Sequence, residues 1–436
     1  MSEAGRIGRS DRCESASLPE GRALPRAAFS ISNFMNTSPT PRLVSLDALR
    51  GFDMFWILGA DALVLALGQL SPSAPVTFLA GQLEHKAWAG FGFYDLIFPL
   101  FVFIVGVSLV FSLGQHLARD GRRAVVTRIL RRTVVLFLLG IFYNGGLAHA
   151  WPDVRIAGVL QRIALAYGAT ALLFVFCRPR TLMITAASLL IGYWALLTFV
   201  PIRAFQLDAA ALAVRLGSGQ PPMADVRAAF AATTEHVTGG TLPGLNLANH
   251  WDFQHLPGAL YDTYYDPEGI LSTLPAVATC LLGVFAGLLL RRTDVPAPAK
   301  ARWLAVGGVV AIVLGWAWGW EFPVIKKLWT SSYVLVAGGW SAVLLGAFYY
   351  VIDVREWRRW CEPFVWIGMN PITLYLATSV IGFHQIASRL VGGSIELWLN
   401  QHVVTGAGEI VVTLLSLGLV LALARFLYRR KIFLRV

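Results

Sequence analysis

The chain has few charged residues and few cysteines. Only 14% of its 436 residues are Asp, Glu, Lys or Arg and 56% are hydrophobic, whereas soluble domains carry roughly 25% charged residues. This composition excludes an ordinary soluble domain. The cysteines (Cys13, Cys177, Cys280 and Cys361) do not follow the spacing of a zinc site, so no bound metal is predicted. The sequence also lacks glycine-rich nucleotide loops and P-loop motifs, which leaves ATP-driven transport without support.

Long apolar segments dominate instead. Ten segments of about 20 residues recur along the chain, and this length crosses a hydrocarbon layer of ~30 Å. Because a backbone in lipid must satisfy its own hydrogen bonds, each segment is predicted to be a helix. The expected spans are residues 49–70, 94–114, 125–143, 156–177, 181–200, 271–290, 303–320, 330–352, 363–382 and 409–427. The predicted fold class is therefore an all-α, polytopic helical membrane protein with about ten transmembrane helices.

Basic residues give the predicted orientation. They cluster in alternate connections, after the second, fourth, sixth and eighth spans and at the end of the chain. By the positive-inside rule these connections face the cytoplasm, which puts the N- and C-termini on the cytoplasmic side. The net charge of +11 is thus interpreted as an orientation signal, and no nucleic-acid partner is predicted.

Two regions outside the spans have their own composition. Residues 1–40 are polar, rich in Ser, Arg and Pro, and lack the apolar core of a signal peptide, so we expect a disordered cytoplasmic tail with Met35 as an alternative start. Residues 41–436 are expected to form the transmembrane domain, with a long periplasmic loop at 201–268. The first part of this loop, 207–234, is alanine-rich and is predicted to form a surface helix. The second part is dense in Asn, His, Asp, Trp and Tyr, which suits either a sugar-binding surface or an interfacial aromatic belt.

The most informative stretch joins a polar cluster directly to a span. It reads HKAWAGFGFYDLIFPLFVFIVGVS from His85 to Ser108, and the apolar run begins just after Asp95. A titratable imidazole at a membrane boundary indicates chemistry at that boundary. Asp95 orients this imidazole, binds an acceptor, or caps the N-terminus of the following helix.

Polar residues also fall inside or at the ends of the predicted spans. Ionisable groups at the centre of a bilayer are costly and are functional candidates by default. Asp47 and Arg50 are spaced i, i+3, so they either pair with each other or contribute to a site. As a set, these residues favour a polar cavity between helices. The set is Asp47, Arg50, Asp53, Asp61, Asn144, Gln161, Arg162, Asn370 and Tyr375.

Six sequence blocks occur in order across residues 42–380. They are RLVSLDALRGFDM (42–54), HKAWAGFGFYDLIFPLFVFIVGVSLVFS (85–112), RIAGVLQRIALAY (155–167), YDPEGILSTLPAVATCLLGVFAG (265–287), VIKKLWTSSYV (324–334) and PFVWIGMNPITLY (363–375). In these blocks the chain resembles the heparan-α-glucosaminide N-acetyltransferase family of transmembrane acetyltransferases, and in particular its shorter bacterial members. The resemblance implies that an acetyl group from cytosolic acetyl-CoA is transferred to an amino sugar or glycan across the membrane. It also implies that His85 is the catalytic histidine and that the protein forms a homodimer.

The matched blocks supply the remaining site residues. Lys326 and Lys327 fall on the predicted outside, against the charge pattern, and either bind anionic groups of CoA or substrate or are interfacial lysines. Asp266 and Glu268 either bind the acceptor amine or are helix N-terminal acids. The predicted catalytic residues are His85 and Asp95. The predicted substrate- or cofactor-binding residues are Asp47, Arg50, Asn144, Arg155, Gln161, Arg162, Asp266, Glu268, Lys326, Lys327, Trp329 and Asn370.

Two chemical routes are compatible with a catalytic imidazole. His85 either attacks the thioester and carries the acetyl group itself, or acts as a general base within a ternary complex. The expected location is a bacterial inner membrane, with the lipid bilayer and a small-molecule or glycan acceptor as partners. The alternative functions are an O-acetyltransferase acting on envelope polysaccharide and a secondary transporter of a small sugar or amino acid. Transporters often contain internal repeats, and no duplication is evident here, which favours the enzyme.

Overall fold

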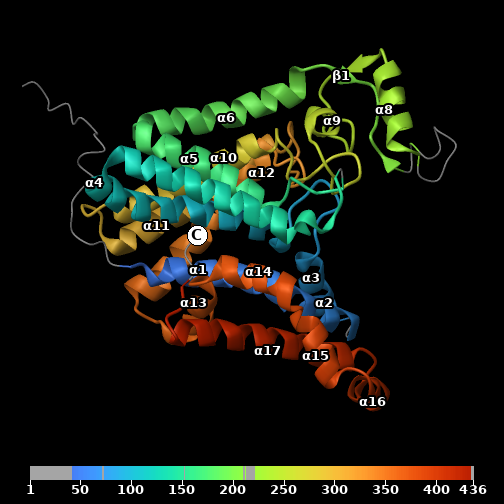
Figure 1. The fold of residues 1–436 in the computed structure, drawn as a ribbon. Coiled ribbons are helices and arrows are strands. Elements are labelled where there is room, and N and C mark those ends of the chain that lie inside the picture. Colours follow the sequence, from blue (N-terminus) through green and yellow to red (C-terminus); the bar gives the residue numbers. More distant parts are fainter. Residues whose placement is uncertain (1–41, 71–72, 152, 210–211, 213–220, 434–436) are drawn as a thin grey trace, which may run out of the picture.

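The computed structural model describes residues 42–70, 73–151, 153–209, 212 and 221–433. The predicted disordered tail, residues 1–40, lies outside these residues. Long helices lie side by side in a bundle, with α6 along one edge and α17 along the other (Figure 1). This arrangement confirms the all-α membrane class predicted from the apolar segments.

The apolar segments form the long helices, and shorter helices connect them or line the ends of the bundle. The long helices are α1 (Val44–Phe55), α4 (Phe93–Tyr143), α5 (Val159–Phe176), α6 (Pro179–Phe199), α10 (Thr273–Arg291), α11 (Ala297–Trp318), α12 (Ser331–Phe348) and α17 (Ala407–Arg429). The shorter ones are α2 (Asp61–Leu70), α3 (Ala74–Leu83), α13 (Glu362–Gly368), α14 (Pro371–Ile381), α15 (Phe383–Val391) and α16 (Ser394–His402). A π-helical turn (Trp56–Ala60) joins α1 to α2, with Gly59 at φ +121°.

In the described part of the chain, eight helices are long and apolar enough to span a membrane, or nine if the bent pair α13–α14 is one span. The longest, α4, has 51 residues, more than twice the length needed for a layer of ~30 Å. Its backbone leaves helical geometry at Gly121, where φ is +77°. Across this point Arg128 hydrogen-bonds His116, although residues twelve apart in a continuous helix are separated by about 18 Å. The chain therefore reverses at Gly121, and α4 supplies two of the ten predicted spans.

Small residues let α4 and α10 pack closely. A Cβ added to Gly106 on α4 would lie 2.0 Å from the carbonyl oxygen of Cys280, and one added to Gly283 on α10 would lie 1.9 Å from that of Phe103. Each glycine thus faces the backbone of the other helix. Close approach of this kind is typical of helix pairs in membranes, where small residues allow backbones to touch.

We expect Gly106→Ala to destabilise the bundle by about 1–3 kcal/mol, because the methyl group must displace backbone atoms of α10. Gly307→Ala in α11 is the matched control, since no atom lies within 4 Å of its added Cβ. Thermal unfolding of the purified protein in detergent measures both. Equal melting temperatures for the two variants would contradict the packing described here.

The described residues of 201–268, which were predicted as a long loop, form a small folded unit that we call the cap. It contains β1 (Ile202–Arg203), α8 (Met223–Ala232), β2 (His236–Val237) and α9 (Leu247–His255), and β1 pairs antiparallel with β2. Helix α8 is the described part of the surface helix expected at 207–234. The cap lies at one end of the bundle (Figure 1). It directly precedes the N-terminal end of α10, whereas the part of α4 that leads to Gly121 contacts the C-terminal end of α10, where Arg291 donates to the carbonyl oxygen of Val110.

Most polar residues in the second part of the cap stabilise the cap itself. The Asn246 side chain accepts a hydrogen bond from the backbone of Asn249 at 2.9 Å and so caps α9. The Asn249 side-chain oxygen in turn accepts from Gly244 N at 3.1 Å. His250 Nε2 lies 2.9 Å from the carbonyl oxygen of Phe205. The composition that suggested a sugar-binding surface is therefore largely used for folding.

Asp252 in α9 gives the cap a predicted pH dependence. Its carboxyl is buried and accepts a hydrogen bond from Ile270 N at 3.0 Å. Burial raises the pKa of Asp252 to about 7, and the bond from Ile270 only partly opposes this. The native state then keeps a proton that the unfolded state loses near pH 4, so stability falls as pH rises from about 4 to about 7.

We expect Asp252→Asn to remove this contribution, which amounts to up to about 3 kcal/mol between pH 5 and pH 8. The measurement is the melting temperature across that range. The variant should lose less stability than wild type on going to pH 8. An unchanged pH dependence would mean that Asp252 is ionised throughout.

Candidate active site

His85 lies between α3 and α4 and pairs with an acid in the first turn of α4. His85 Nδ1 is 3.0 Å from Asp95 Oδ1. The Asp95 side chain is 1% exposed, whereas 54% of the His85 side chain is exposed. Because a carboxylate only accepts hydrogen bonds, we assign the proton to Nδ1 and the lone pair to Nε2. A fixed carboxylate thus orients an accessible imidazole.

Asp95 is itself held by the start of α4 and by α12. Its second carboxylate oxygen accepts from Gly92 N at 3.1 Å and completes the N-terminal cap of α4. Its backbone carbonyl accepts from the Tyr333 hydroxyl of α12 at 2.8 Å. Two of the roles considered from the sequence, orienting the imidazole and capping the helix, are therefore performed by the same side chain.

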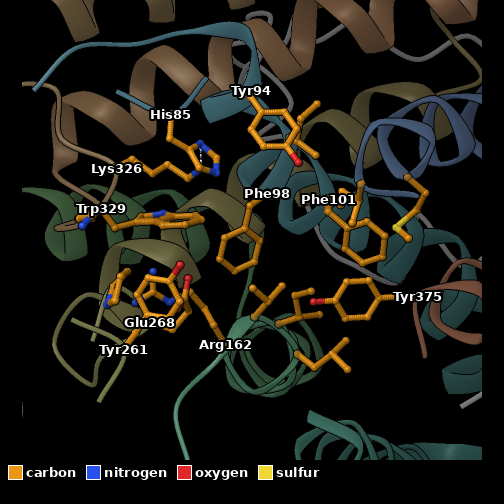
Figure 2. Close-up of a pocket in the computed structure, with 18 of the residues that line it drawn as sticks. His85, Tyr94, Phe98, Phe101, Arg162, Tyr261, Glu268, Lys326, Trp329 and Tyr375 are labelled. Atoms are coloured by element: carbon orange, nitrogen blue, oxygen red, sulfur yellow. Dashed lines mark hydrogen bonds between the residues drawn. The ribbon is translucent and has the colours of Figure 1, made fainter. Parts of the chain in front are cut away.

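A connection far away in sequence adds a cation to this pair. Gly90 N donates to the carbonyl oxygen of Val324 at 2.9 Å, which ties the His85 segment to the connection between α11 and α12. Lys326 Nζ consequently lies 3.0 Å from His85 Nδ1 (Figure 2). It also lies 3.4 Å from Asp95 Oδ1, which is its acceptor because Nδ1 carries a proton. Burial lowers the pKa of Lys326, and the charge of Asp95 opposes this shift. The ammonium balances the buried carboxylate behind the imidazole.

These residues border a cavity of about 540 Å³ that continues between the helices (Figure 2). Apolar side chains from α1, α4 and α5 form much of its wall, including Met54, Phe98, Phe101 and Ile163. Its polar and aromatic lining is His85, Lys86, Tyr94, Arg155, Arg162, Tyr261, Glu268, Lys326, Lys327, Trp329 and Tyr375. Seven of the predicted site residues therefore share one cavity. They are His85, Arg155, Arg162, Glu268, Lys326, Lys327 and Trp329.

Arg155 joins the start of α5 to the segment before α10. It forms a bidentate ion pair with Asp266 at 2.9 and 2.8 Å, and its Nη2 also lies 2.8 Å from Glu268 Oε2. Burial opposes ionisation of Asp266, but the bonds from Arg155 outweigh it and lower the pKa of Asp266. Burial raises the pKa of Glu268. Arg155 and Glu268 line the cavity, and Asp266 holds Arg155 in position.

Arg162 and Trp329 form the deeper part of the wall. Arg162 is 1% exposed, its Nη2 donates to the Ser272 hydroxyl, and its guanidinium lies 4.9 Å from the centre of the Trp329 ring. Trp329 has φ +52°, a conformation that bulky residues rarely adopt outside functional sites. In Figure 2 its ring lies between His85 and Lys326 on one side and Arg162 and Glu268 on the other. Lys327, nearby, pairs with Asp262 at 2.8 Å.

The predicted residues of the first span lie outside the cavity lining. Arg50 Nη1 is 3.5 Å from Asp47 Oδ1, which confirms the i, i+3 pair. Arg50 Nη2 also donates to the Ser108 hydroxyl at 2.7 Å. Asp53 is fully buried, and neither carboxylate oxygen has a hydrogen-bond partner among the described residues. Arg50 thus has partners on other helices and Asp47 pairs within its own segment, and a ligand role for them stays a prediction.

Three other candidates also lie away from the cavity lining. The Asn144 side chain donates to the carbonyl oxygen of Ala157 at 2.9 Å, and that of Asn370 donates to the carbonyl oxygen of Ile432 at 3.0 Å. Asn370 lies at the bend between α13 and α14. Gln161 is buried, and its amide group has no partner within the described part of the chain.

Sequence reasoning missed aromatic residues of the site. The Tyr94 ring lies 4.7 Å from that of His85, and its hydroxyl donates to Asp61 at 2.6 Å. By contrast, Tyr375 belongs to the polar set expected around a cavity; it lines the cavity and stacks on Tyr143, with the ring centres 4.2 Å apart. The position of Tyr94 directly before Asp95 was an available signal. In the described residues no group of three or more His, Cys, Asp or Glu side chains could hold a metal ion.

The arrangement is suited to acyl transfer. An imidazole oriented by a carboxylate can act as a nucleophile or a general base. The adjoining cavity has polar side chains that can bind an acyl acceptor and an apolar wall that can bind an elongated acyl donor.

Comparisons with known proteins agree with this chemistry. Residues 42–220 match the family model described as "Heparan-alpha-glucosaminide N-acetyltransferase, catalytic". The heparan-alpha-glucosaminide N-acetyltransferase of Mus musculus is 30% identical over 326 residues, which cover 68% of this chain and 49% of that protein. The protein of the same name from Homo sapiens is 29% identical over 441 residues, covering 91% of this chain and 60% of that protein.

The chain spans about half of the mouse relative and three fifths of the human one. The matched region of the family model includes His85, Asp95, Arg155 and Arg162. The chain therefore belongs to the heparan-α-glucosaminide N-acetyltransferase family.

Proposed function

We propose that the protein is a transmembrane acetyltransferase that moves an acetyl group from cytosolic acetyl-CoA to an amino sugar or glycan on the periplasmic side. It is a multi-pass protein of a bacterial inner membrane in this proposal. The observation that carries it is the oriented His85–Asp95 pair beside a cavity that continues between membrane-spanning helices. The names of the relatives support acetyl transfer to an amine.

The charge distribution supports the proposed orientation. The connection around Gly121 carries Arg119, Arg122 and Arg123 and lies toward the C-terminal end of α10, whereas the cap precedes the N-terminal end of α10. Under the positive-inside rule the end with these arginines faces the cytoplasm. The cap and His85 then face the periplasm, where the acceptor arrives. The homodimer that the resemblance implies stays a prediction.

His85 acts at the reacting carbonyl in either route. As a general base, Nε2 takes a proton from the acceptor nitrogen as that nitrogen attacks the acetyl carbon. As a nucleophile, Nε2 attacks the same carbon and the acetyl group passes through the imidazole. Asp95 stabilises the positive charge that develops on the ring in both cases.

The test is turnover of radiolabelled acetyl-CoA by the purified protein with glucosamine as acceptor. Labelled N-acetylglucosamine together with released CoA is the expected result. Solute accumulation in proteoliposomes without consumption of acetyl-CoA would replace the enzyme by a transporter. CoA release with label on a hydroxyl group of a polysaccharide would replace N-acetylation by O-acetylation.

A further inference from the structure

Glu268 is the only carboxylate that lines the cavity within the described residues, and five cationic side chains share that lining. It approaches from the segment before α10, and its backbone N donates to Asp266 Oδ1 at 2.9 Å. Its carboxyl contacts Arg155, which is already engaged by Asp266 through both Nε and Nη2. One guanidinium therefore serves two acids, and Glu268 is the one of these two acids that reaches the cavity wall.

The groups around Glu268 influence whether its carboxyl is ionised. The charged and titratable groups facing it are Arg155 and Asp266 in contact, and Arg162, Lys326, Tyr333 and Tyr375 within electrostatic reach. Arg162 directs its Nη2 to Ser272 and Gly269, and its positive charge favours the ionised form of Glu268. Burial favours the protonated carboxyl. The group is thus able both to accept and to release a proton.

Proton balance creates a need for a second base. An amino sugar near neutral pH is largely an ammonium ion, and its nitrogen must lose two protons to become an amide. His85 takes one of them during acyl transfer. We infer that Glu268 binds the acceptor ammonium and removes the first proton, which makes the amine nucleophilic. This inference rests on the proposed function and assigns a residue to a step that His85 does not perform.

The step balances as follows. The ammonium transfers a proton to the Glu268 carboxylate and becomes a neutral amine. The amine nitrogen attacks the acetyl carbon, the C–N bond forms, and the C–S bond breaks. The second nitrogen proton goes to His85 and from there to the CoA thiolate, and Glu268 returns its proton to solvent. One ammonium and one acetyl-CoA thus give one amide, one CoA thiol and one proton.

The test compares the pH dependence of kcat/KM for glucosamine in wild type and Glu268→Gln. At pH 6 the acceptor is protonated, and kcat/KM of the variant should be about 100-fold lower than that of wild type. A loss of this size is typical when a general base is removed. At pH 9 the acceptor arrives as free amine, and the variant should approach the wild-type value. Glu321→Gln, on an exposed residue outside the cavity, is the matched control and should follow wild type throughout.

A second measurement needs no variant. In wild type, kcat/KM should decline less steeply toward acid pH than the free-amine fraction of glucosamine does. A decline that tracks this fraction would overturn the inference. So would a Glu268→Gln defect of equal size at pH 6 and pH 9, which marks a structural role, or the absence of any defect. Failure of wild type to acetylate glucosamine at every pH would instead overturn the proposed function.

Discussion

Replacement of His85 by alanine is expected to reduce acetyl transfer about 1,000-fold or more, with normal folding. The expected loss is large because no other imidazole lines the cavity in the described structure. Folding should be preserved because 54% of the side chain is exposed and Asp95 keeps its bond to Gly92 and its ion pair with Lys326. The measurement is kcat with labelled acetyl-CoA, together with the melting temperature of the variant.

His384→Ala provides the matched control. His384 is exposed, lies 3.3 Å from Glu409, and is not part of the cavity lining. Its replacement should leave turnover unchanged. If His85→Ala and the control turned over equally, the catalytic centre would lie elsewhere in the chain.

Asp95→Asn is the second substitution with a large expected effect. An amide can still accept the bond from Gly92, but it can present its NH₂ group to His85 Nδ1 and favour the wrong tautomer, with Nε2 protonated. A comparable swap in the serine protease triad lowers kcat about 10⁴-fold, and we expect a loss of about 100-fold or more here. The KM for both substrates should change much less than kcat, because Asp95 touches neither.

The measurement is a steady-state comparison with Asp225→Asn, an exposed acid in the first turn of α8. That control should behave as wild type. A rise in KM with unchanged kcat in Asp95→Asn would show that Asp95 contributes to binding instead of orienting the imidazole.

The fold was largely predictable because membrane spans are read from length and apolarity alone. Departures occur where local backbone geometry intervenes. The π-helical turn with Gly59 at φ +121° divides the first span, and the bend of 69° at Asn370 divides the ninth. A hydropathy profile does not reveal these two breaks, because the segments before and after each break are both apolar. The sequence predicted a loop for the cap because its helices and strands are short. They are stabilised by a separate hydrophobic core, which includes Phe205, Phe230 and Phe253.

The site was predictable where residues are close in sequence and less so where the fold brings them together. His85 and Asp95 are ten residues apart, and their pairing followed from one block. Lys326 is 241 residues away from His85 in sequence, and a backbone hydrogen bond between their two connections brings them together. The spacing of residues in the sequence does not predict this contact. The Arg155–Asp266 pair spans 111 residues in the same way.

Other intramembrane polar residues were correctly located but given too uniform a role. Arg50 donates to Ser108 on α4, and Asn144 donates to the backbone of Ala157 just before α5. Polarity within a span signals a requirement for a partner, and only the packed structure tells whether that partner is a ligand or another helix. Tyr94 was missed for the opposite reason, because an aromatic residue at the start of an apolar segment looks like ordinary core.

The central claim is transfer across the membrane, and sided proteoliposomes test it most directly. Glucosamine would be sealed inside vesicles that carry the protein, and labelled acetyl-CoA would be added outside to molecules whose basic end faces outward. The account predicts labelled N-acetylglucosamine inside the vesicles from wild type and none from His85→Ala. Product formed only when donor and acceptor are placed on the same side would contradict it.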